Sequence, residues 1–200
     1  MDKKSTRRSS GPRSFDRADA VETAMRLFRR YGYEGVSIAD LTKAIGIAPP
    51  SLYAAFGNKA GLYREALDLY AGLPGSLDGM ENAATLKEAV AGLLEAAARA
   101  VTAEEPGCMI STGLVAAGAE HADLCEELAA RRKSLQEDIA SRLEQWVVPQ
   151  EAERLAAFLF SVQQGMSVQA RDGARLEDLL MIAQEAVAGV AARRSMTSHN

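Results

Sequence analysis

The stretch SIADLTKAIGIAPPSLYAAFGNK, residues 37–59, decides the fold. Ser37, with an Asp three positions later, forms a capping box, which starts a helix. Gly46 ends that helix, because a glycine adopts the left-handed conformation of a helix end at no cost. Pro49 and Pro50 suit the first turn of a second helix, where a missing N–H is no loss. The stretch therefore predicts two short helices joined by a tight turn.

Both helices have an apolar face. In the first helix the apolar residues recur at a spacing of three and four: Ile38, Leu41, Ala44 and Ile45. In the second helix Leu52 and Phe56, four positions apart, are expected to anchor it to the core, which leaves outward-facing positions at Ser51, Tyr53, Ala54 and Ala55. Helix, short turn and helix form the DNA-binding motif that places its second helix in the major groove.

The chain around this motif resembles the TetR family of bacterial transcriptional regulators. The resemblance covers residues 15–70, through Ala24, Leu27, Phe28, Gly32, Tyr33, Ser37, Ile38, Leu41, Gly46, Leu52, Tyr53, Phe56, Lys59 and Leu62. A weaker resemblance, to a late helix in one branch of the family, covers residues 164–173. The family resemblance implies an all-α fold, in which an N-terminal three-helix helix-turn-helix domain precedes a larger helical domain for ligand binding and dimerisation.

The resemblance also implies a set of residues that contact DNA. Family members use the positions of Pro50, Ser51, Tyr53, Ala54 and Ala55 against DNA, with Tyr53 and Lys59 commonly on the backbone. The full candidate set is Ser37, Pro49, Pro50, Ser51, Tyr53, Ala54, Ala55 and Lys59. A phenol and a hydroxyl can donate to phosphate oxygens, a helix N-terminus attracts phosphate, and a lysine adds charge.

The second helix departs from the commoner family pattern. Ala48 stands where a capping Ser or Thr is frequent, and Ala54 and Ala55 stand where larger polar or aromatic residues are frequent. No Arg, Gln or Asn on this helix can make a bidentate base contact, so readout rests on thymine-methyl contacts, Ser51 and DNA shape. Two alternatives stay open: that Tyr53 belongs to the core, and that the chain is a helical interaction module that has lost DNA binding.

Charge is distributed unevenly along the chain. Residues 1–64 carry 12 Lys or Arg against 6 Asp or Glu, whereas residues 65–200 carry 11 against 21. The N-terminal third is therefore the end expected to approach a polyanion. Residues 1–14 are basic and rich in Ser, which predicts a disordered arm. That arm either follows phosphates or enters the minor groove, or it is a solvated tail.

Helical patterns without strand signals continue to the end of the chain. A cluster of Gly and Pro from Gly72 onward predicts a boundary between a DNA-binding domain, residues 15–71, and a ligand-binding and dimerisation domain, residues 72–194. Residues 195–200 are predicted to be a disordered tail. Residues 109–119 are predicted to be a short helix, and three basic residues of the first helix are expected to lie on a solvated face: Arg26, Arg29 and Arg30.

The last two helices are apolar enough to suggest a subunit interface. In the family resembled here they pack against their copies in a second subunit, and a two-fold dimer reads two half-sites. The predicted interface residues are Leu155, Leu159, Val162, Met166, Leu179, Ala183, Val187 and Val190. The alternative is that these side chains are buried within one chain.

The resemblance further implies a small-molecule effector, whose identity the sequence does not give. Candidate ligand contacts, chosen by position and type, are Cys108, Met109, Thr112, Phe158, Phe160 and Gln164, although an ordinary core also explains them. Cys108 follows a Pro-Gly pair at a predicted helix start, where the helix dipole favours a thiolate. Sensing of an oxidant or electrophile is therefore an alternative, as is a small buried hydrophobic residue.

Several classes of protein lack support in the sequence. No apolar run reaches the length of a membrane span, and no signal peptide is recognised, so we expect a cytoplasmic protein. Two Cys and two His provide no metal-ligand cluster, and no cofactor motif or catalytic constellation appears. The sequence thus predicts a ligand-released repressor that binds a palindromic operator as a homodimer, or alternatively a thiol-based redox regulator acting through Cys108.

Overall fold

The computed structural model describes residues 15–113 and 119–197, and within these ranges every regular element is a helix. The predicted all-α fold is confirmed. The elements are α1 (Arg17–Tyr31), α2 (Ile38–Ile45), α3 (Pro49–Phe56), α4 (Lys59–Ala71), the 3₁₀ helix η1 (Ser76–Met80), α5 (Leu86–Val101), the 3₁₀ helix η2 (Ala119–His121), α6 (Ala122–Leu143), α7 (Pro149–Arg171) and α8 (Leu176–Thr197). None of the described helices is long and apolar enough to cross a membrane.

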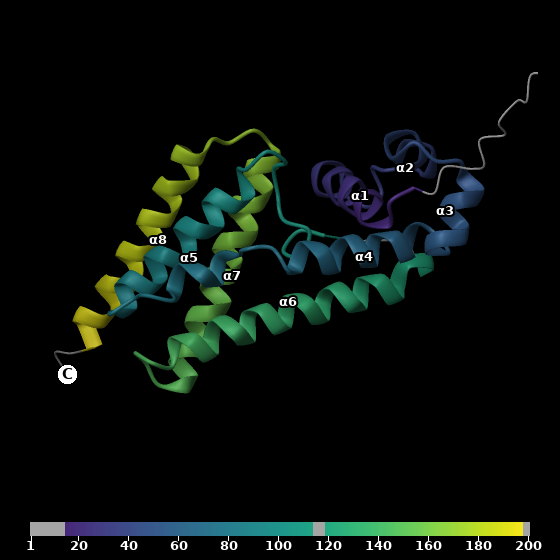
Figure 1. Cartoon of the computed structure of the whole chain (residues 1–200). Helices are drawn as coiled ribbons and strands as arrows, with labels where there is room; N and C mark the ends of the chain where they lie inside the picture. The colour runs from purple at the N-terminus through teal and green to yellow at the C-terminus, as the bar shows by residue number, and fades with distance from the viewer. Residues whose placement is uncertain (1–14, 114–118, 198–200) are drawn as a thin grey trace, which may run out of the picture.

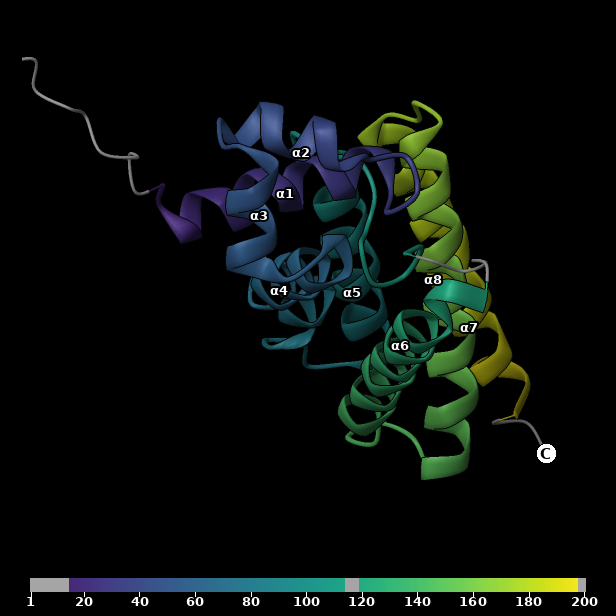
Figure 2. The same ribbon diagram turned by 90° about the vertical axis from the view of Figure 1, so that its right-hand side faces the viewer.

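Helices α1 to α4 pack around an aromatic centre at one end of the molecule (Figures 1 and 2). The Phe28 ring from α1 lies 4.9 Å from the Tyr63 ring of α4, centroid to centroid, in an edge-to-face arrangement. The Tyr33 ring lies 5.1 Å from the same Tyr63 ring. All three rings are buried, so the short helices α2 and α3 are held on a rigid support.

The core of these helices is completed by residues from beyond the predicted boundary near residue 72. Met109, Leu124 and Leu128 are fully or almost fully buried in the same cluster as the side chains of α1 to α4. Helix α6 runs alongside α4 (Figure 1), and its Asp123 and Glu127 carboxylates each accept a 2.7 Å hydrogen bond from the Arg64 guanidinium. The N-terminal helices are therefore packed against the rest of the chain.

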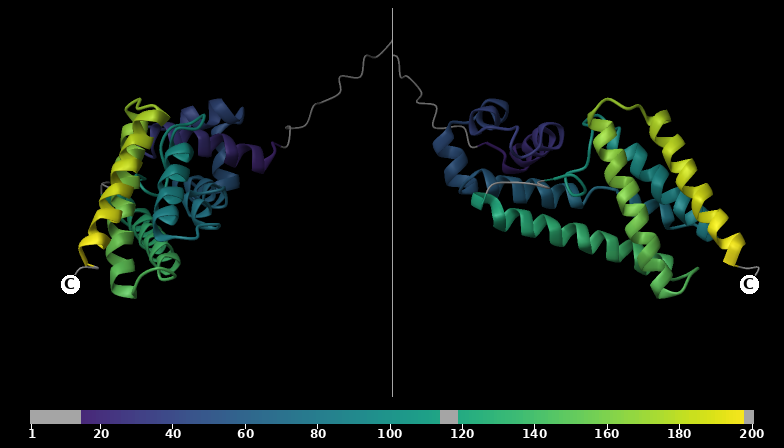
Figure 3. Two further views of the ribbon diagram at one scale, coloured as in Figure 1. Left: turned by 90° about the vertical axis from the view of Figure 1, so that its left-hand side faces the viewer. Right: turned by 180° about the vertical axis from the view of Figure 1, so that it is seen from behind.

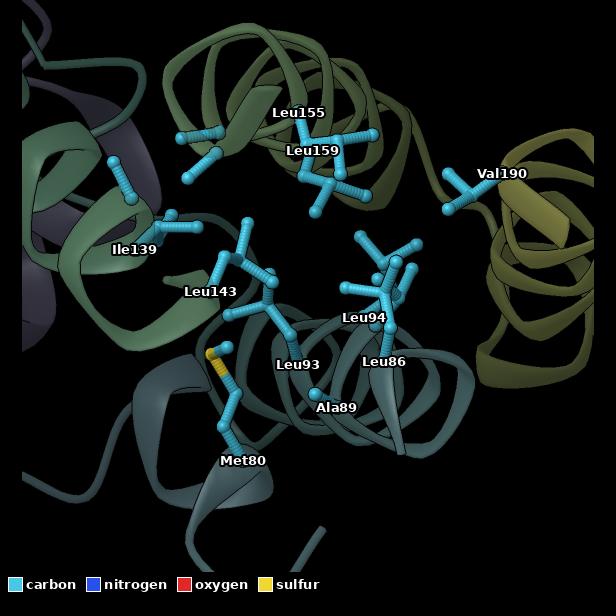
Figure 4. Close-up of a cluster of buried hydrophobic side chains, with 14 of the residues drawn as sticks. Met80, Leu86, Ala89, Leu93, Leu94, Ile139, Leu143, Leu155, Leu159 and Val190 are labelled. Atoms are coloured by element: carbon cyan, nitrogen blue, oxygen red, sulfur yellow. The ribbon is translucent and has the colours of Figure 1, made fainter. Parts of the chain in front are cut away.

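Helices α5 to α8 and η1 enclose a second core (Figure 4). Leu93 of α5, Leu143 of α6 and Leu159 of α7 are fully buried and point toward one another. Helix η1 lies directly on α5, because Gly79 and Gly92 leave room for backbone contact. A Cβ added at Gly92 would lie 1.9 Å from the Gly79 carbonyl oxygen.

Two details of the sequence prediction are corrected. Residues 109–113 form turns and not a helix, while residues 114–118 lie outside the described residues. Helix α8 continues to Thr197, so the predicted C-terminal tail is helical over its first residues. The predicted basic arm, residues 1–14, lies outside the described residues.

Candidate DNA-binding site and adjoining cavity

The capping box of α2 is formed as predicted. The Ser37 hydroxyl oxygen accepts a hydrogen bond from the Asp40 backbone N–H at 3.1 Å, and the Asp40 carboxylate accepts one from the Ser37 N–H at 2.9 Å. Gly46 closes the helix in the left-handed conformation with φ 79°. Ala44, predicted to face the core, is exposed, and Thr42 is buried instead, with its hydroxyl donating to the Ile38 carbonyl at 2.9 Å.

Helix α3 is anchored by the two side chains that the spacing predicted. Leu52 is fully buried and Phe56 is 6% exposed. The Phe56 ring contacts the Phe15 ring, and the Arg17 guanidinium lies 4.5 Å from its centroid. The outward-facing prediction is confirmed for Ser51, Tyr53 and Ala54, whereas Ala55 is half-buried. Pro49 and Pro50 are exposed as well.

The exposed face of α3 carries few polar groups. Tyr53, with 48% of its surface exposed, and Ser51 supply the hydroxyls of this face. Ala48 provides no side-chain cap, the two prolines remove two N–H donors, and the Ser51 N–H donates to the Ala48 carbonyl at 2.9 Å. The first turn of α3 is therefore a poorer phosphate site than a helix N-terminus with free amides.

Two further predicted DNA contacts are already engaged within the chain. The Ser37 hydroxyl is exposed but donates to the Asp40 carboxylate at 2.6 Å. The Lys59 ammonium lies 4.0 Å from the centroid of the Tyr33 ring, and partial burial lowers the pKa of Lys59. Lys43, an exposed residue in the last turn of α2, is a basic candidate that the sequence prediction missed. Its exposed position next to the turn was the available signal.

The described part of the DNA-binding region is electrically balanced. Residues 15–71 hold seven Lys or Arg and seven Asp or Glu, whereas residues 1–14 hold five Lys or Arg and one Asp. The excess positive charge at this end of the chain therefore lies mainly in the predicted arm. Several cations of residues 15–71 are also ion-paired, as in the 2.5 Å contact between Arg17 and Glu65.

A cavity of about 310 Å³ lies where the N-terminal helices meet the rest of the chain. Its lining comes from α1, α4, η1, α5, α6 and the turns that follow α4 and α5: Arg29, Tyr70, Ala71, Leu73, Pro74, Gly75, Leu77, Asp78, Ala100, Cys108, Ile110, Leu135 and Arg142. Of the six predicted ligand contacts, Cys108 lines this cavity. The other five do not.

Those five residues have other surroundings. Met109 is fully buried in the core of the N-terminal helices and Phe160 is buried in the second core, whereas Phe158 is 36% exposed. The Thr112 hydroxyl donates to the Cys108 carbonyl at 2.8 Å, and the Gln164 amide donates to the Ser111 carbonyl at 2.9 Å. Thr112 and Gln164 therefore shape the turn at residues 108–112 and its contact with α7.

Cys108 does not begin a helix, so the predicted dipole effect on its thiol is wrong. Its backbone N–H donates to the Ser167 hydroxyl at 2.8 Å, and its Sγ accepts from the Ser111 N–H at 3.3 Å. Its side chain faces the cavity that Tyr70 also lines. Burial, and then the interaction with Cys108, raise the pKa of Tyr70, so its phenol stays protonated at neutral pH.

Arg29 does not lie on a solvated face. Its guanidinium is half-buried and donates from Nε to the Gly107 carbonyl at 3.0 Å and from Nη2 to the Ala100 carbonyl. These bonds tie α1 to the segment that follows α5. Arg26 and Arg30 are exposed, as predicted.

A larger and more open groove of about 660 Å³ lies between α1 and α4. Val21, Met25, Leu69 and Leu73 form its apolar part. Three of its carboxylates are already paired: Glu22 with Arg26, Glu65 with Arg17 and Asp68 with Arg131. Most of the negative charge in this groove is therefore already neutralised by arginines.

The predicted dimer residues point into the chain. Leu155, Leu159, Met166, Leu179, Ala183 and Val190 are buried, and Val162 and Val187 are half-buried. Figure 4 shows Leu155, Leu159 and Val190 directed at the core. Helices α7 and α8 lie side by side (Figure 3), and their exposed apolar side chains are Phe158, Val168 and Met181. Both helices thus have apolar residues on two faces, six of the eight predicted interface residues are buried within the chain, and the interface itself stays a prediction.

Comparison with known proteins supplies the relatives of this chain. The family model for bacterial regulatory proteins of the tetR family matches residues 20–66. The transcriptional repressor ComR of Escherichia coli (strain K12) is 34% identical over 183 residues, which are 86% of this chain and 87% of ComR. The repressor BdcR of the same strain is 33% identical over 193 residues, 94% of this chain and 95% of BdcR.

A similar structure has been solved with DNA. The TetR family regulator CifR, as a cysteine mutant complexed with 26-bp double-strand operator DNA, matches with a TM-score of 0.81 at 35% identity, over 90% of this chain and 98% of that chain. With relatives above 30% identity along nearly the whole length, and a helix-turn-helix in the matched segment, the chain belongs to the TetR family of bacterial transcriptional regulators and is not an enzyme.

Proposed function

We propose that this protein is a cytoplasmic repressor that binds a palindromic operator as a homodimer and leaves the DNA when a small effector binds. The observation that carries the proposal is an anchored α3 with Tyr53 exposed beside Pro50, Ser51 and Ala54. Repressors by name among the relatives support the direction of control.

In this proposal α3 enters the major groove. Tyr53 and Ser51 donate hydroxyl hydrogens to phosphates or base edges, and Ala54 and Pro50 contact thymine methyl groups. Lys59 and Ser37 contact the DNA at the two ends of this surface. The Lys59 ammonium does so while it remains next to the Tyr33 ring. Since this face offers no bidentate donor or acceptor, much of the specificity comes from DNA shape.

The proposed dimer uses the outer faces of α7 and α8, where Phe158, Val168 and Met181 are exposed beside small residues such as Gly165 and Gly189. Small residues let two helix pairs approach closely, and exposed apolar patches mark interaction sites. Residues 15–71 then form the DNA-binding part, and residues 72–194 form the effector-binding and dimerisation part.

The effector is proposed to enter the 310 Å³ cavity. Arg29 and Tyr70 come from the DNA-binding helices, whereas Leu135 and Arg142 come from α6. An occupant contacts both groups of helices at once, so its binding energy can favour one relative position of α4 and α6 over another. In a dimer such a shift changes the distance between the two copies of α3.

The direct test is fluorescence anisotropy on the DNA upstream of the protein's own gene, against scrambled DNA of equal length. We expect much tighter binding to the upstream DNA, a steep salt dependence, and weakening of up to about tenfold by Tyr53→Ala, the range for loss of one hydrogen bond. Tyr31→Ala is the matched control, because Tyr31 is a tyrosine of similar exposure, 54%, on α1. Equal, weak binding to both DNAs would count for an interaction module or for an operator elsewhere, and selection of bound genomic fragments separates these two.

The interface is tested by sedimentation of Val168→Arg and Met181→Arg. Each places a charge on the proposed contact and should convert dimer to monomer. Val148→Arg is the control, since Val148 is 65% exposed at the start of α7. A wild-type chain that sediments as a monomer, or dimers that survive both changes, would contradict this interface.

A second candidate is a thiol-responsive regulator. It is favoured by one observation, that Cys108 lines the cavity and is not sealed in an apolar core. Addition of the Cys108 sulfur across the double bond of N-ethylmaleimide, with the thiol proton passing to carbon, should then release the operator. Cys108→Ser should abolish the response and Cys125→Ser, which removes the other half-buried thiol, should not.

A further inference from the structure

The cavity between the two groups of helices has a positive lining in an otherwise acidic part of the chain. Arg29 and Arg142 both line it. Neither guanidinium lies within 4.0 Å of a carboxylate among the described residues, as both donate to backbone carbonyls. Arg142 donates to the Leu77 carbonyl at 3.2 Å. Both positive charges therefore lack a countercharge in direct contact.

The described lining holds a single acidic residue, so the two guanidiniums leave it with a net positive charge. Asp78 accepts a hydrogen bond from the Gly75 N–H at 2.9 Å and so caps η1. A third cation stands behind the wall, because the Arg171 guanidinium donates to the Arg29 carbonyl at 3.4 Å and the Arg171 Nε is buried without a partner in the described structure. Two guanidiniums therefore line the cavity, and a third lies next to one of them.

Donor groups remain for a ligand. A guanidinium has five N–H donors. Arg29 uses its Nε and Nη2 in hydrogen bonds within the chain, and Arg142 uses its Nη1. The Tyr70 phenol also lines the cavity, where it interacts with Cys108. Acceptors on the side chains of the wall are scarce by comparison.

The remaining wall is apolar. Its larger members are Leu73, Pro74, Leu77, Ala100, Ile110 and Leu135. A volume of about 310 Å³ is at the lower end of the range for small-molecule pockets. The cavity therefore suits a compact hydrocarbon or aromatic body with one acidic group at one end.

We propose that the effector is a small organic monocarboxylate, whose head group binds Arg142 and Arg29 and whose apolar body packs against Leu77 and Leu135. This inference rests on the proposed function, because it names the chemical class of the effector. A carboxylate between Arg29 of α1 and Arg142 of α6 supplies the negative charge that both arginines lack in direct contact. It also links the DNA-binding helices to α6. Charge-assisted, bidentate contacts of this kind are the strong ones.

The test uses thermal shift and calorimetric titration of the full chain with benzoate, phenylacetate, hexanoate and octanoate. Each acid is compared with its own amide, which has nearly the same shape and no charge. We expect at least one acid to bind and its amide to bind about 10- to 100-fold more weakly, the range for a hydrogen bond to a charged group.

Variants locate the site. Arg142→Gln should weaken acid binding by about 10- to 100-fold. Arg142→Lys keeps the charge and loses the planar guanidinium, so its affinity for the acid should lie between those of wild type and Arg142→Gln. Arg132→Gln is the matched control. Arg132 is also half-buried and donates to backbone carbonyls, those of Gly113 at 2.8 Å and Ile110 at 3.4 Å, but it does not itself line the cavity. Melting of each variant without ligand checks that it is folded.

The proposal is overturned if no acid in the series binds, if an amide binds as tightly as its acid, or if Arg142→Gln binds like wild type. Operator binding without ligand is measured in the same buffer, so that failure of the proposed function is recognised separately. An acid that binds through Arg142 and leaves operator affinity unchanged supports the site and contradicts release by this ligand.

Discussion

Helix α3 and the 310 Å³ cavity differ in the polar side chains that they present. The exposed face of α3 offers hydroxyls and methyl groups, with Tyr53 as its largest side chain. The cavity, by contrast, gathers two guanidiniums, a phenol and a thiol between helices that are distant in sequence. The part expected to meet a highly charged polymer is therefore weakly charged, and the part expected to meet a small molecule is strongly charged.

This difference places the electrostatic attraction to DNA outside α3. Residues 15–71 are balanced in charge, whereas residues 1–14 have five Lys or Arg against one Asp. Non-specific affinity for DNA depends on the number of phosphates that cations neutralise. If α3 and its neighbours alone account for the salt dependence of DNA binding, this difference between the two regions does not hold. If residues 1–14 account for it, the difference is supported.

Deletion of residues 1–14 is expected to have the largest effect. Each arm cation that contacts a phosphate contributes about 0.9 to the slope of log affinity against log salt, so the slope should become shallower by up to about 4.5 per subunit, or about 9 for the proposed dimer. Operator titrations between 50 and 200 mM salt, about the range over which such slopes are resolved, measure it. A chain in which the five basic residues are replaced by Gln separates charge from length, and an unchanged slope would mean that the arm is a solvated tail.

Leu52→Ala tests how far α3 depends on its anchor. Leu52 is fully buried, so its truncation should lower the free energy of unfolding by about 2 to 5 kcal/mol. Operator affinity should fall as well, because α3 loses its fixed orientation. Urea unfolding measures the first effect, and Leu69→Ala, at a residue 39% exposed, should cost much less. A cost below 1 kcal/mol would show that α3 is held by something other than this contact.

Arg29→Gln tests the hydrogen bonds that join α1 to the end of α5 and the segment after it. Loss of its bonds leaves the Gly107 and Ala100 carbonyls without their donor, which should cost about 1 to 3 kcal/mol in the free energy of unfolding. Arg26→Gln removes an exposed pair with Glu22 and should cost less than about 0.5 kcal/mol. Chemical denaturation of both variants gives the comparison, and equal costs would contradict a structural role for Arg29.

The same two regions show what a sequence can predict. The boundaries and orientation of α3 follow from local rules, since Gly46, the two prolines and the spacing of Leu52 and Phe56 each act within a few residues. The role of Arg29 does not follow, because its acceptors are more than 70 positions away. From sequence, an arginine on an amphipathic helix is predicted to be solvated unless its tertiary partners are known.

The burial of most predicted interface residues within the chain could not be predicted from sequence for a related reason. Helix α7 has apolar residues on both its inner face, as at Leu159, and its outer face, as at Val168. Periodicity finds apolar positions but does not tell which face another helix of the same chain already covers. The turn at residues 108–112 was missed because side chains of α7, including Ser167 and Gln164, bind its backbone.

The smallest effect concerns the pH dependence of the α2 capping box, which sets where the two-helix motif begins. Hydrogen bonds from the Ser37 hydroxyl and backbone N–H hold the pKa of Asp40 below its usual value of 3.8. A carboxylate whose pKa is lowered by folding stabilises the native state above the unfolded pKa, and this contribution is lost as pH falls through the folded pKa. Asp40→Asn should therefore be less stable than wild type at pH 7, and the difference should shrink in acid, below the pKa of the unfolded chain. Urea unfolding at both ends of that range measures it. In a Ser37→Ala background, where the main partner is absent, the pH-dependent part should largely disappear, and its persistence there would assign the effect to another contact.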